Sequence, residues 1–216
     1  MIDDTKIRDY IISPNLSGED LTQEVAGVDQ LGNRTDISVI EERPLTIFLN
    51  NQEIVTAMTI GDYPEYLALG FLRNQKMLSN KDKVDAIDFD AELNSIVIRT
   101  KRKTNYEDKL KKKTQTSGCA VGTVFGDIMD GVDGLKISAI STKVSHLYSL
   151  SSKINRTPSL YLKAGAIHGT ILCHQDKPLV YMEDVGRHNA VDKIAGWIFD
   201  TGTNPRDKIL YTTGRL

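Results

Sequence analysis

The sequence has little cysteine and no long run of apolar residues, and both absences exclude whole classes of protein. Two cysteines, Cys119 and Cys173, occur in 216 residues. They are too few for a disulfide framework, so we expect two free thiols in a reducing compartment. The longest near-continuous apolar stretch, Tyr66 to Leu72, is far shorter than the ~20 residues that a transmembrane helix needs. No apolar block follows the acidic N-terminus, as it would in a signal or transit peptide. We therefore expect a cytoplasmic protein without a membrane span.

Acidic and basic residues are nearly balanced over the whole sequence, except in one segment. With 40% hydrophobic and 26% charged residues, the composition excludes a disordered tail, a collagen and a coiled coil. The segment Lys101–Lys113 holds seven basic and two acidic residues, a net charge of +5 in a chain whose total is -2. Nucleic-acid-binding domains are usually basic throughout, so nucleic acid is not an expected partner. The segment is either a solvated stretch or a neighbourhood that lowers the pKa of Cys119 and attracts phosphate groups.

Periodicity predicts a small α+β unit in the first hundred residues. Residues 1–37 have no sustained period, and we interpret them as a loosely ordered N-terminal arm that leads into a first strand at Val39–Ile40. Apolar and polar residues alternate over 44–60 on both sides of Asn50–Asn51, which predicts a β-hairpin. Asp62 before Pro64 indicates the start of a helix that runs to about residue 75. Strands at 84–89 and 95–100 complete a hairpin/helix/hairpin unit over 38–104.

The second half predicts a layered α/β domain after a long loop. Residues 101–134 have no period, and compact domains rarely contain such a loop without a use for it. Beyond it we expect a helix at 141–156 that buries Val144, Leu147 and Leu150, a better helix at 189–199, and strands at 160–172, 179–182 and 208–213. The fold class is therefore α/β (α+β overall), with a basic, cysteine-bearing loop at 105–135 and an α/β domain at 136–216.

Cys119 is the first candidate for chemistry, because glycines flank it in the long loop and allow a ligand to approach closely. The alternative is a small packed side chain, which is our prediction for Cys173 at the end of an apolar strand. His168, Cys173 and His174 raise the question of a metal site. On one strand the two histidines would lie about 20 Å apart, at ~3.3 Å per residue, so we predict no metal site there.

Two Gly-Arg turns follow strands near the C-terminus and predict an anion site. Gly186–Arg187–His188 precedes the best helix, where free N–H groups and a guanidinium favour phosphate and His188 can exchange a proton. The alternative is ordinary capping by Asp184 or Asn189 beside a solvated arginine. Gly214–Arg215 repeats the arrangement after the last strand. Successive strand ends would share one edge of a parallel sheet, where such folds bind ligands, so recognition of phosphate is the leading prediction.

At these residues the sequence resembles the formate dehydrogenase accessory sulfurtransferase (FdhD) family. The resemblance extends from about residue 38 to the end of the chain. Its motifs are Glu42–Leu45, Ser117–Cys119, Gly165–Gly169, Asp184–Lys193 and Thr213–Leu216. It implies a cytidine-deaminase-like fold for 136–216, without the zinc signature of that fold. Members of the family continue beyond the Gly-Arg-Leu turn, so we expect the domain to be incomplete here. A sheet without its last strands has an open edge, and a homodimer is a further expectation.

The resemblance also implies a reaction. Cys119 would accept persulfide sulfur from a cysteine desulfurase and pass it to the molybdenum bis(molybdopterin guanine dinucleotide) cofactor of formate dehydrogenase. The cofactor would be held by Arg187, Arg215, Gly214 and the neighbouring backbone amides, with His168 and His188 as proton donors. Gly122 stands where family members usually have a second cysteine, so the persulfide role falls to Cys119 alone.

Two alternatives belong to other classes of protein. The chain could be a non-catalytic module that binds the guanine-dinucleotide cofactor and delivers it, with affinity that survives loss of Cys119. It could also be a deaminase-type hydrolase, but the sequence has no His-x-Glu motif and no paired cysteines to hold zinc. We rank the hydrolase last.

Overall fold

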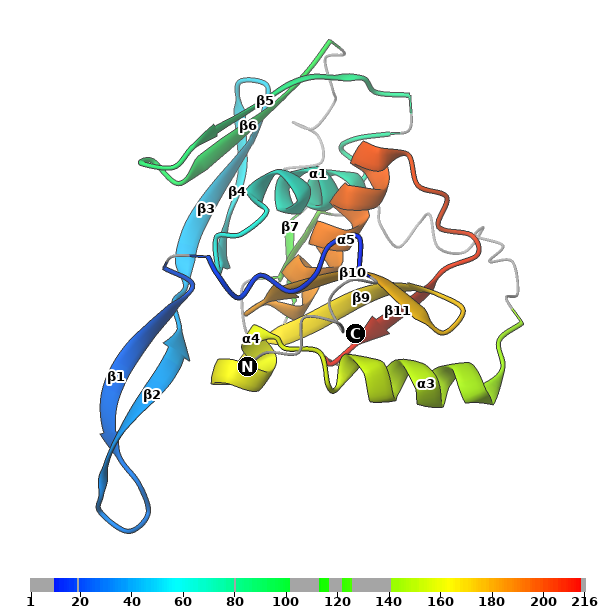
Figure 1. The fold of residues 1–216 in the computed structure, drawn as a ribbon. Helices are drawn as coiled ribbons and strands as arrows, with labels where there is room; N and C mark the ends of the chain where they lie inside the picture. The colour runs from blue at the N-terminus through cyan, green and yellow to red at the C-terminus, as the bar shows by residue number, and fades with distance from the viewer. Residues whose placement is uncertain are drawn as a thin grey trace.

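The computed structural model describes residues 10–18, 20–79, 81–101, 113–116, 122–125 and 141–214. Two sheets lie on either side of a pair of crossed helices (Figure 1). The α/β class expected from the sequence is confirmed. None of the described helices is both long and apolar enough to cross a membrane.

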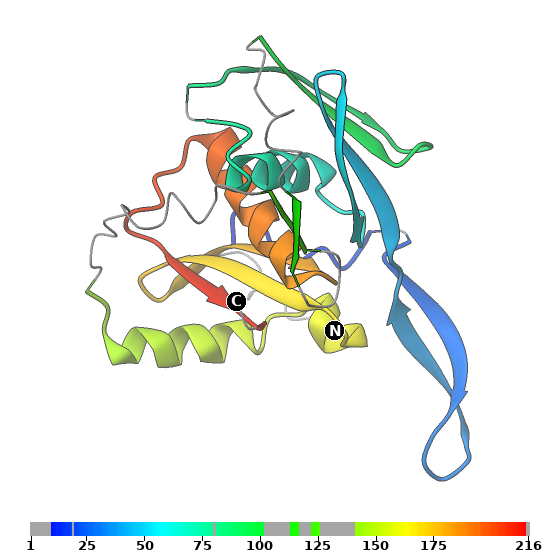
Figure 2. The same ribbon diagram turned by 180° about the vertical axis from the view of Figure 1, so that it is seen from behind.

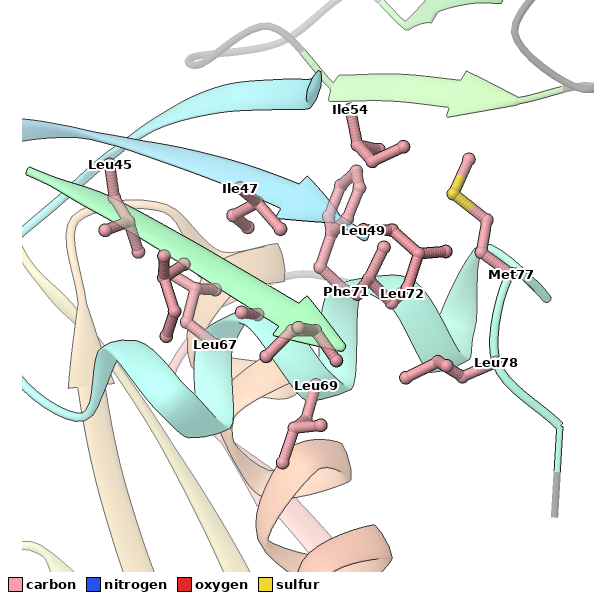
Figure 3. Close-up of a cluster of buried hydrophobic side chains, with 13 residues drawn as sticks. Leu45, Ile47, Leu49, Ile54, Leu67, Leu69, Phe71, Leu72, Met77 and Leu78 are labelled. Atoms are coloured by element: carbon pink, nitrogen blue, oxygen red, sulfur yellow. The ribbon is translucent and has the colours of Figure 1, made fainter. Parts of the chain in front are cut away.

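The first sheet has four strands in the order β4-β3-β6-β5. The predicted hairpin consists of β3 (Arg43–Leu49) and β4 (Gln52–Thr59), and Asn50 takes the positive φ of 54° that the turn requires. β5 (Val84–Asp90) and β6 (Ser95–Thr100) form the second predicted hairpin, and β6 pairs in parallel with β3. Helix α1 (Pro64–Asn74), also as predicted, covers one face of this sheet. Its leucines and Phe71 meet Leu45, Ile47 and Leu49 in the core (Figure 3).

The second sheet has three strands in the order β10-β9-β11. These are β9 (His168–His174), β10 (Lys177–Asp184) and β11 (Ile209–Thr212). The predicted parallel sheet is wrong, because both β10 and β11 pair antiparallel with β9. The two outer strands therefore run in the same direction, and their carboxyl ends still lie at one edge.

A helix covers each face of this second sheet. Helix α5 (Arg187–Thr201) packs its Ile194 and Trp197 on Leu172, Val180 and Met182. Helix α3 (Val144–Ile154) packs Leu150 and Ile154 on the opposite face, against Ile171, Cys173 and Tyr181. The alternation of side chains along a strand thus divides β9 and β10 between two cores.

Helices α1 and α5 cross at two glycines, Gly70 and Gly196. A Cβ atom on Gly70 would lie 1.7 Å from the backbone oxygen of Asp192, and one on Gly196 would lie 1.9 Å from that of Tyr66. Only glycine allows the two backbones to approach so closely. The crossing fixes the first sheet relative to the second.

Four expectations about local structure are wrong. The region expected to be a loosely ordered arm contains a hairpin, β1 (Thr22–Val28) and β2 (Arg34–Ile40), which projects from the body (Figures 1 and 2). The region expected to be a long loop contains another antiparallel pair of strands, β7 (Lys113–Thr116) and β8 (Gly122–Phe125). Residues 160–164 form a short helix, α4 (Leu160–Ala164), instead of the start of a strand. In α3, Val144 and Leu147 are exposed, and the buried pair is Leu150 and Ile154.

Candidate functional site

The candidate site lies at the edge where β10 and β11 end and β9 begins. His168, the first residue of β9, pairs with Asp184, the last residue of β10. On the other side, the backbone N–H of Thr213 donates to the Gly169 carbonyl (3.0 Å), and the N–H of Gly169 donates to Thr213 Oγ1 (2.9 Å). His168 therefore lies between the ends of the two outer strands. The antiparallel sheet brings together the turns that the sequence placed on a parallel one.

Gly214 packs closely against two of the predicted site residues. A methyl group in place of its hydrogen would lie 2.9 Å from His168 Nδ1 and 3.1 Å from Arg187 Cβ. Such distances leave no room for a side chain unless the imidazole moves. The structure thus brings His168, Arg187 and Gly214 into one place from three separate segments of the chain.

Helix α5 begins at Arg187, two residues earlier than predicted, and no side chain caps its N-terminus. Neither Asp184 nor Asn189 caps the helix in the way that the alternative interpretation required. The Nε atom of Arg187 is buried and has no hydrogen-bond partner in the described part of the chain. A buried guanidinium N–H without an acceptor is unfavourable, and an anion at this helix end would satisfy it.

His188 follows Arg187 and is exposed. Partial burial, and then the positive charge of Arg187, lower its pKa below the usual value for histidine. The imidazole is therefore mainly neutral near pH 7, and it can accept a proton there.

A buried cluster of charged groups lies directly behind the helix start. The carboxylate of Asp184 accepts hydrogen bonds from the Gly186 N–H (3.1 Å), Asn189 Nδ2 (3.0 Å) and Thr59 Oγ1 (2.5 Å). Lys193 Nζ lies 2.7 Å from the same carboxylate. Asp184 and Lys193 have no exposed surface, so this ion pair is shielded from water.

Lys193 also connects the cluster to the N-terminal unit. Its ammonium donates to Asp62 Oδ1 (2.5 Å) and to the Glu183 carbonyl (2.9 Å). Burial alone would lower the pKa of Lys193, but the two carboxylates outweigh burial and raise it. Asp62, predicted to mark the start of α1, uses its side chain for this ion pair, and α1 has no side-chain cap.

Of the remaining residues considered in the sequence analysis, some lie outside the described part of the chain and others lie away from the candidate site. Cys119 and Arg215 lie outside the described residues. Cys173 is fully buried in the core between α3 and the sheet, as predicted, and burial raises its pKa to about 12. His174 lies at the opposite end of β9 from His168, 3.4 Å from Asp207. Among the described residues, no three His, Cys, Asp or Glu side chains gather as a metal site would require.

Sequence reasoning missed the roles of Lys193, Asp62 and Glu183. One signal was present: Lys193 lies six residues after the start of α5, on the side of the helix that packs against β10. A lysine inside an apolar pattern predicts a buried acidic partner. The sequence alone does not indicate which of its many carboxylates that partner is.

Comparison with known proteins places the sequence in a family. The FdhD/NarQ family model matches residues 40–216, so the hairpin of β1 and β2 lies almost wholly before the match. A protein named sulfur carrier protein FdhD from Bacillus subtilis (strain 168) is 28% identical over 189 residues, which are 84% of this chain and 72% of that protein. One of the same name from Listeria monocytogenes (serotype 4b, strain F2365) is 25% identical over 183 residues, 83% of this chain and 70% of that protein.

A solved structure has the same fold. The crystal structure of a formate dehydrogenase accessory protein from Desulfotalea psychrophila superposes with a TM-score of 0.68 and 24% sequence identity, over 90% of this chain and 74% of the other. Because the family model extends over most of the sequence, including β3, β9, β10 and the start of α5, the chain belongs to the FdhD/NarQ family.

Proposed function

We propose that this chain is a sulfur carrier that takes persulfide sulfur from a cysteine desulfurase onto Cys119. It then passes the sulfur to the molybdenum bis(molybdopterin guanine dinucleotide) cofactor destined for formate dehydrogenase. The names of the relatives support the carrier role, and the name of the solved structure supports formate dehydrogenase as the client.

Sulfur transfer needs one ionised thiol and one acceptor. The Cys119 thiolate attacks the outer sulfur of the donor persulfide, a new S–S bond forms, and the donor leaves as a thiolate. In the second step that S–S bond breaks, and its electron pair returns to Cys119. The acceptor donates an electron pair to the outer sulfur as the S–S bond breaks, so a sulfur–acceptor bond forms and no free sulfur is released. Cys173 cannot replace Cys119, since burial keeps it protonated and out of reach.

The structural observation that supports the proposal most directly is the buried Nε atom of Arg187, which has no hydrogen-bond partner in the described part of the chain. It lies at an uncapped helix N-terminus, and Gly214 packs closely beside both Arg187 and His168. A diphosphate carries the charge and the acceptor oxygens that this arrangement lacks. The guanine dinucleotide ends of the cofactor contain such a diphosphate. His168, the first residue of β9, and His188, in the first turn of α5, are the groups that would exchange protons with a bound acceptor.

Intact-mass spectrometry tests the carrier step. The chain is incubated with a cysteine desulfurase and cysteine, and Cys119→Ala and Cys173→Ala are treated in parallel. We expect wild type and Cys173→Ala to gain the mass of one sulfur atom and Cys119→Ala to gain none. An unmodified wild type, or equal labelling of Cys119→Ala, would remove the proposal.

A second candidate function is cofactor binding and delivery without sulfur chemistry. The observation that favours it is Gly122, at the start of β8, in the place of the usual second cysteine. This candidate predicts that the affinity for GDP survives Cys119→Ala and falls in Arg187→Ala, while even the wild-type chain gains no persulfide. The mass measurement therefore separates the two functions.

A further inference from the structure

Two consecutive buried carboxylates, Glu183 and Asp184, end strand β10. Successive side chains of a strand point to opposite faces of the sheet, so the two reach different elements. Glu183 is 2% exposed and Asp184 is fully buried. Each carboxylate accepts hydrogen bonds from a segment that comes shortly before a candidate site residue: His168 for Glu183 and Arg187 for Asp184.

Glu183 holds the connection that leads to His168. Its two carboxylate oxygens accept the backbone N–H groups of Leu160 and Tyr161, each at 2.9 Å, where α4 begins. From α4 the chain passes through Gly165 and Ala166, both at positive φ, directly into β9 at His168. The position of His168 thus depends on the end of β10.

Asp184 holds the turn that leads to Arg187. One oxygen accepts the N–H of Gly186, the residue before the helix, and the Nδ2 of Asn189 in its first turn. The Asn189 amide also donates to the Met58 carbonyl at 2.7 Å, which attaches the helix start to β4. These bonds fix the direction in which α5 presents Arg187.

The ammonium of Lys193 contacts both Glu183 and Asp184, the first through its backbone carbonyl and the second through its carboxylate. Its ammonium has three N–H donors, and three acceptors surround it: Asp184 Oδ2, the Glu183 carbonyl and Asp62 Oδ1. Every donor is used and the side chain has no exposed surface, so Lys193 can neither touch a ligand nor exchange a proton with one. Its effect on the site must pass through β10.

We propose that Lys193 is a positioning residue, which aligns Arg187 and His168 as one diphosphate site by holding the end of β10 and the β4–α1 connection together. The inference rests on the proposed binding of a guanine nucleotide at this edge. It adds Asp62, more than a hundred residues away in sequence, to the groups on which the site depends.

The test compares affinity with stability. The double substitution Lys193→Met with Asp62→Asn removes the ammonium together with one of its two carboxylate partners. Asn74→Ala is the matched control, since it deletes the 2.6 Å bond to Asp192 at the same α1–α5 contact without touching β10. GDP affinity is measured by calorimetry at a temperature at which circular dichroism shows all variants folded.

We expect both variants to unfold more easily and only the double variant to bind GDP less tightly, by roughly tenfold, as for outer-shell partners of metal ligands. The ring resonances of His168 and His188 should shift in the double variant alone. Equal GDP affinity in wild type and double variant would overturn the positioning role and leave the proposed function intact. No GDP binding by wild type would overturn the positioning role together with the nucleotide site on which it rests, and the mass measurement tests the sulfur step separately.

Thr59→Val keeps the test decisive if the double variant does not fold. It removes the hydroxyl that donates to Asp184 Oδ2 and accepts the Gly61 N–H at 3.3 Å, and it preserves shape and charge. We expect a smaller loss of GDP affinity, about threefold, corresponding to ~0.7 kcal/mol. Unchanged affinity and unchanged histidine resonances would contradict the proposal.

Discussion

Replacement of Gly70 by alanine should destabilise the fold strongly, against the ordinary helix propensity. In an exposed helix, alanine is more favourable than glycine by ~1 kcal/mol. At Gly70 the added methyl carbon would lie 1.7 Å from the Asp192 carbonyl oxygen and 2.8 Å from the Gly196 nitrogen. Both neighbours are backbone atoms of a helix, so no side chain can rotate away.

The size of the effect follows from how far the helices must separate. Ordinary contact begins at 3.4 Å, so the 1.7 Å approach requires a separation of roughly 1.7 Å at the crossing. A gap of even 0.5–1 Å forfeits about a quarter to a half of the dispersion energy between facing atoms. Overpacking of a core costs about 1–3 kcal/mol. We expect Gly70→Ala to lower the free energy of unfolding by about 3 kcal/mol, the upper end of this range, because the contact is between two main chains.

Urea unfolding measures this loss, and the single tryptophan provides the signal. Trp197 lies on α5, one residue from the crossing at Gly196, and is 5% exposed. Gly202→Ala is the control: it meets no atom within 4 Å, and its φ of +65° should cost about 1–2 kcal/mol. If Gly70→Ala destabilises the chain less than Gly202→Ala does, the close crossing of α1 and α5 is wrong.

Three further predictions concern titration, the site and the thiols. Burial raises the pKa of Asp192 from 3.8 to about 7, so the folded chain keeps a proton that the unfolded chain releases. The free energy of unfolding should fall as pH rises from about 4 to about 7, by up to ~1.4 kcal/mol per pH unit from this group, and an unchanged slope in Asp192→Asn would contradict this. Gly214→Ala should weaken GDP binding about tenfold in calorimetry, or ~1.4 kcal/mol, because its methyl group displaces the His168 ring; full affinity would place the site elsewhere. Iodoacetamide at about pH 8 should alkylate Cys173 only in the unfolded chain, since burial raises its pKa to about 12; rapid labelling of the native chain, seen in peptide masses, would refute its burial.

The elements that sequence predicted well are those that bury one regular face. The hairpin of β3 and β4 alternates cleanly and places Leu45, Ile47 and Leu49 in the core, and α5 follows its helical period against β10. Hairpin β1–β2 was missed because it projects from the body, and its apolar side chains, such as Val28 and Ile37, are exposed. A strand without a buried face leaves only a weak pattern.

Short elements and long-range pairs account for the other errors. Helix α4 has five residues, too few for a period, although the Ser159 hydroxyl that accepts the Leu162 N–H was a recognisable capping signal. The site was predicted from the two Gly-Arg turns, and the structure does bring Gly214 beside Arg187. The pairing of Lys193 with Asp62 depends on how two distant helices cross, which no local pattern encodes.

Transfer of labelled sulfur in a single turnover tests the central claim most directly. The chain is loaded with ³⁵S from labelled cysteine by a desulfurase, separated from the donor, and mixed with the molybdenum guanine dinucleotide cofactor. We predict that label leaves the Cys119 peptide and appears on the cofactor in equal amount, and that Cys119→Ala transfers none. Label that stays on the chain, or equal transfer by Cys119→Ala, would contradict the account.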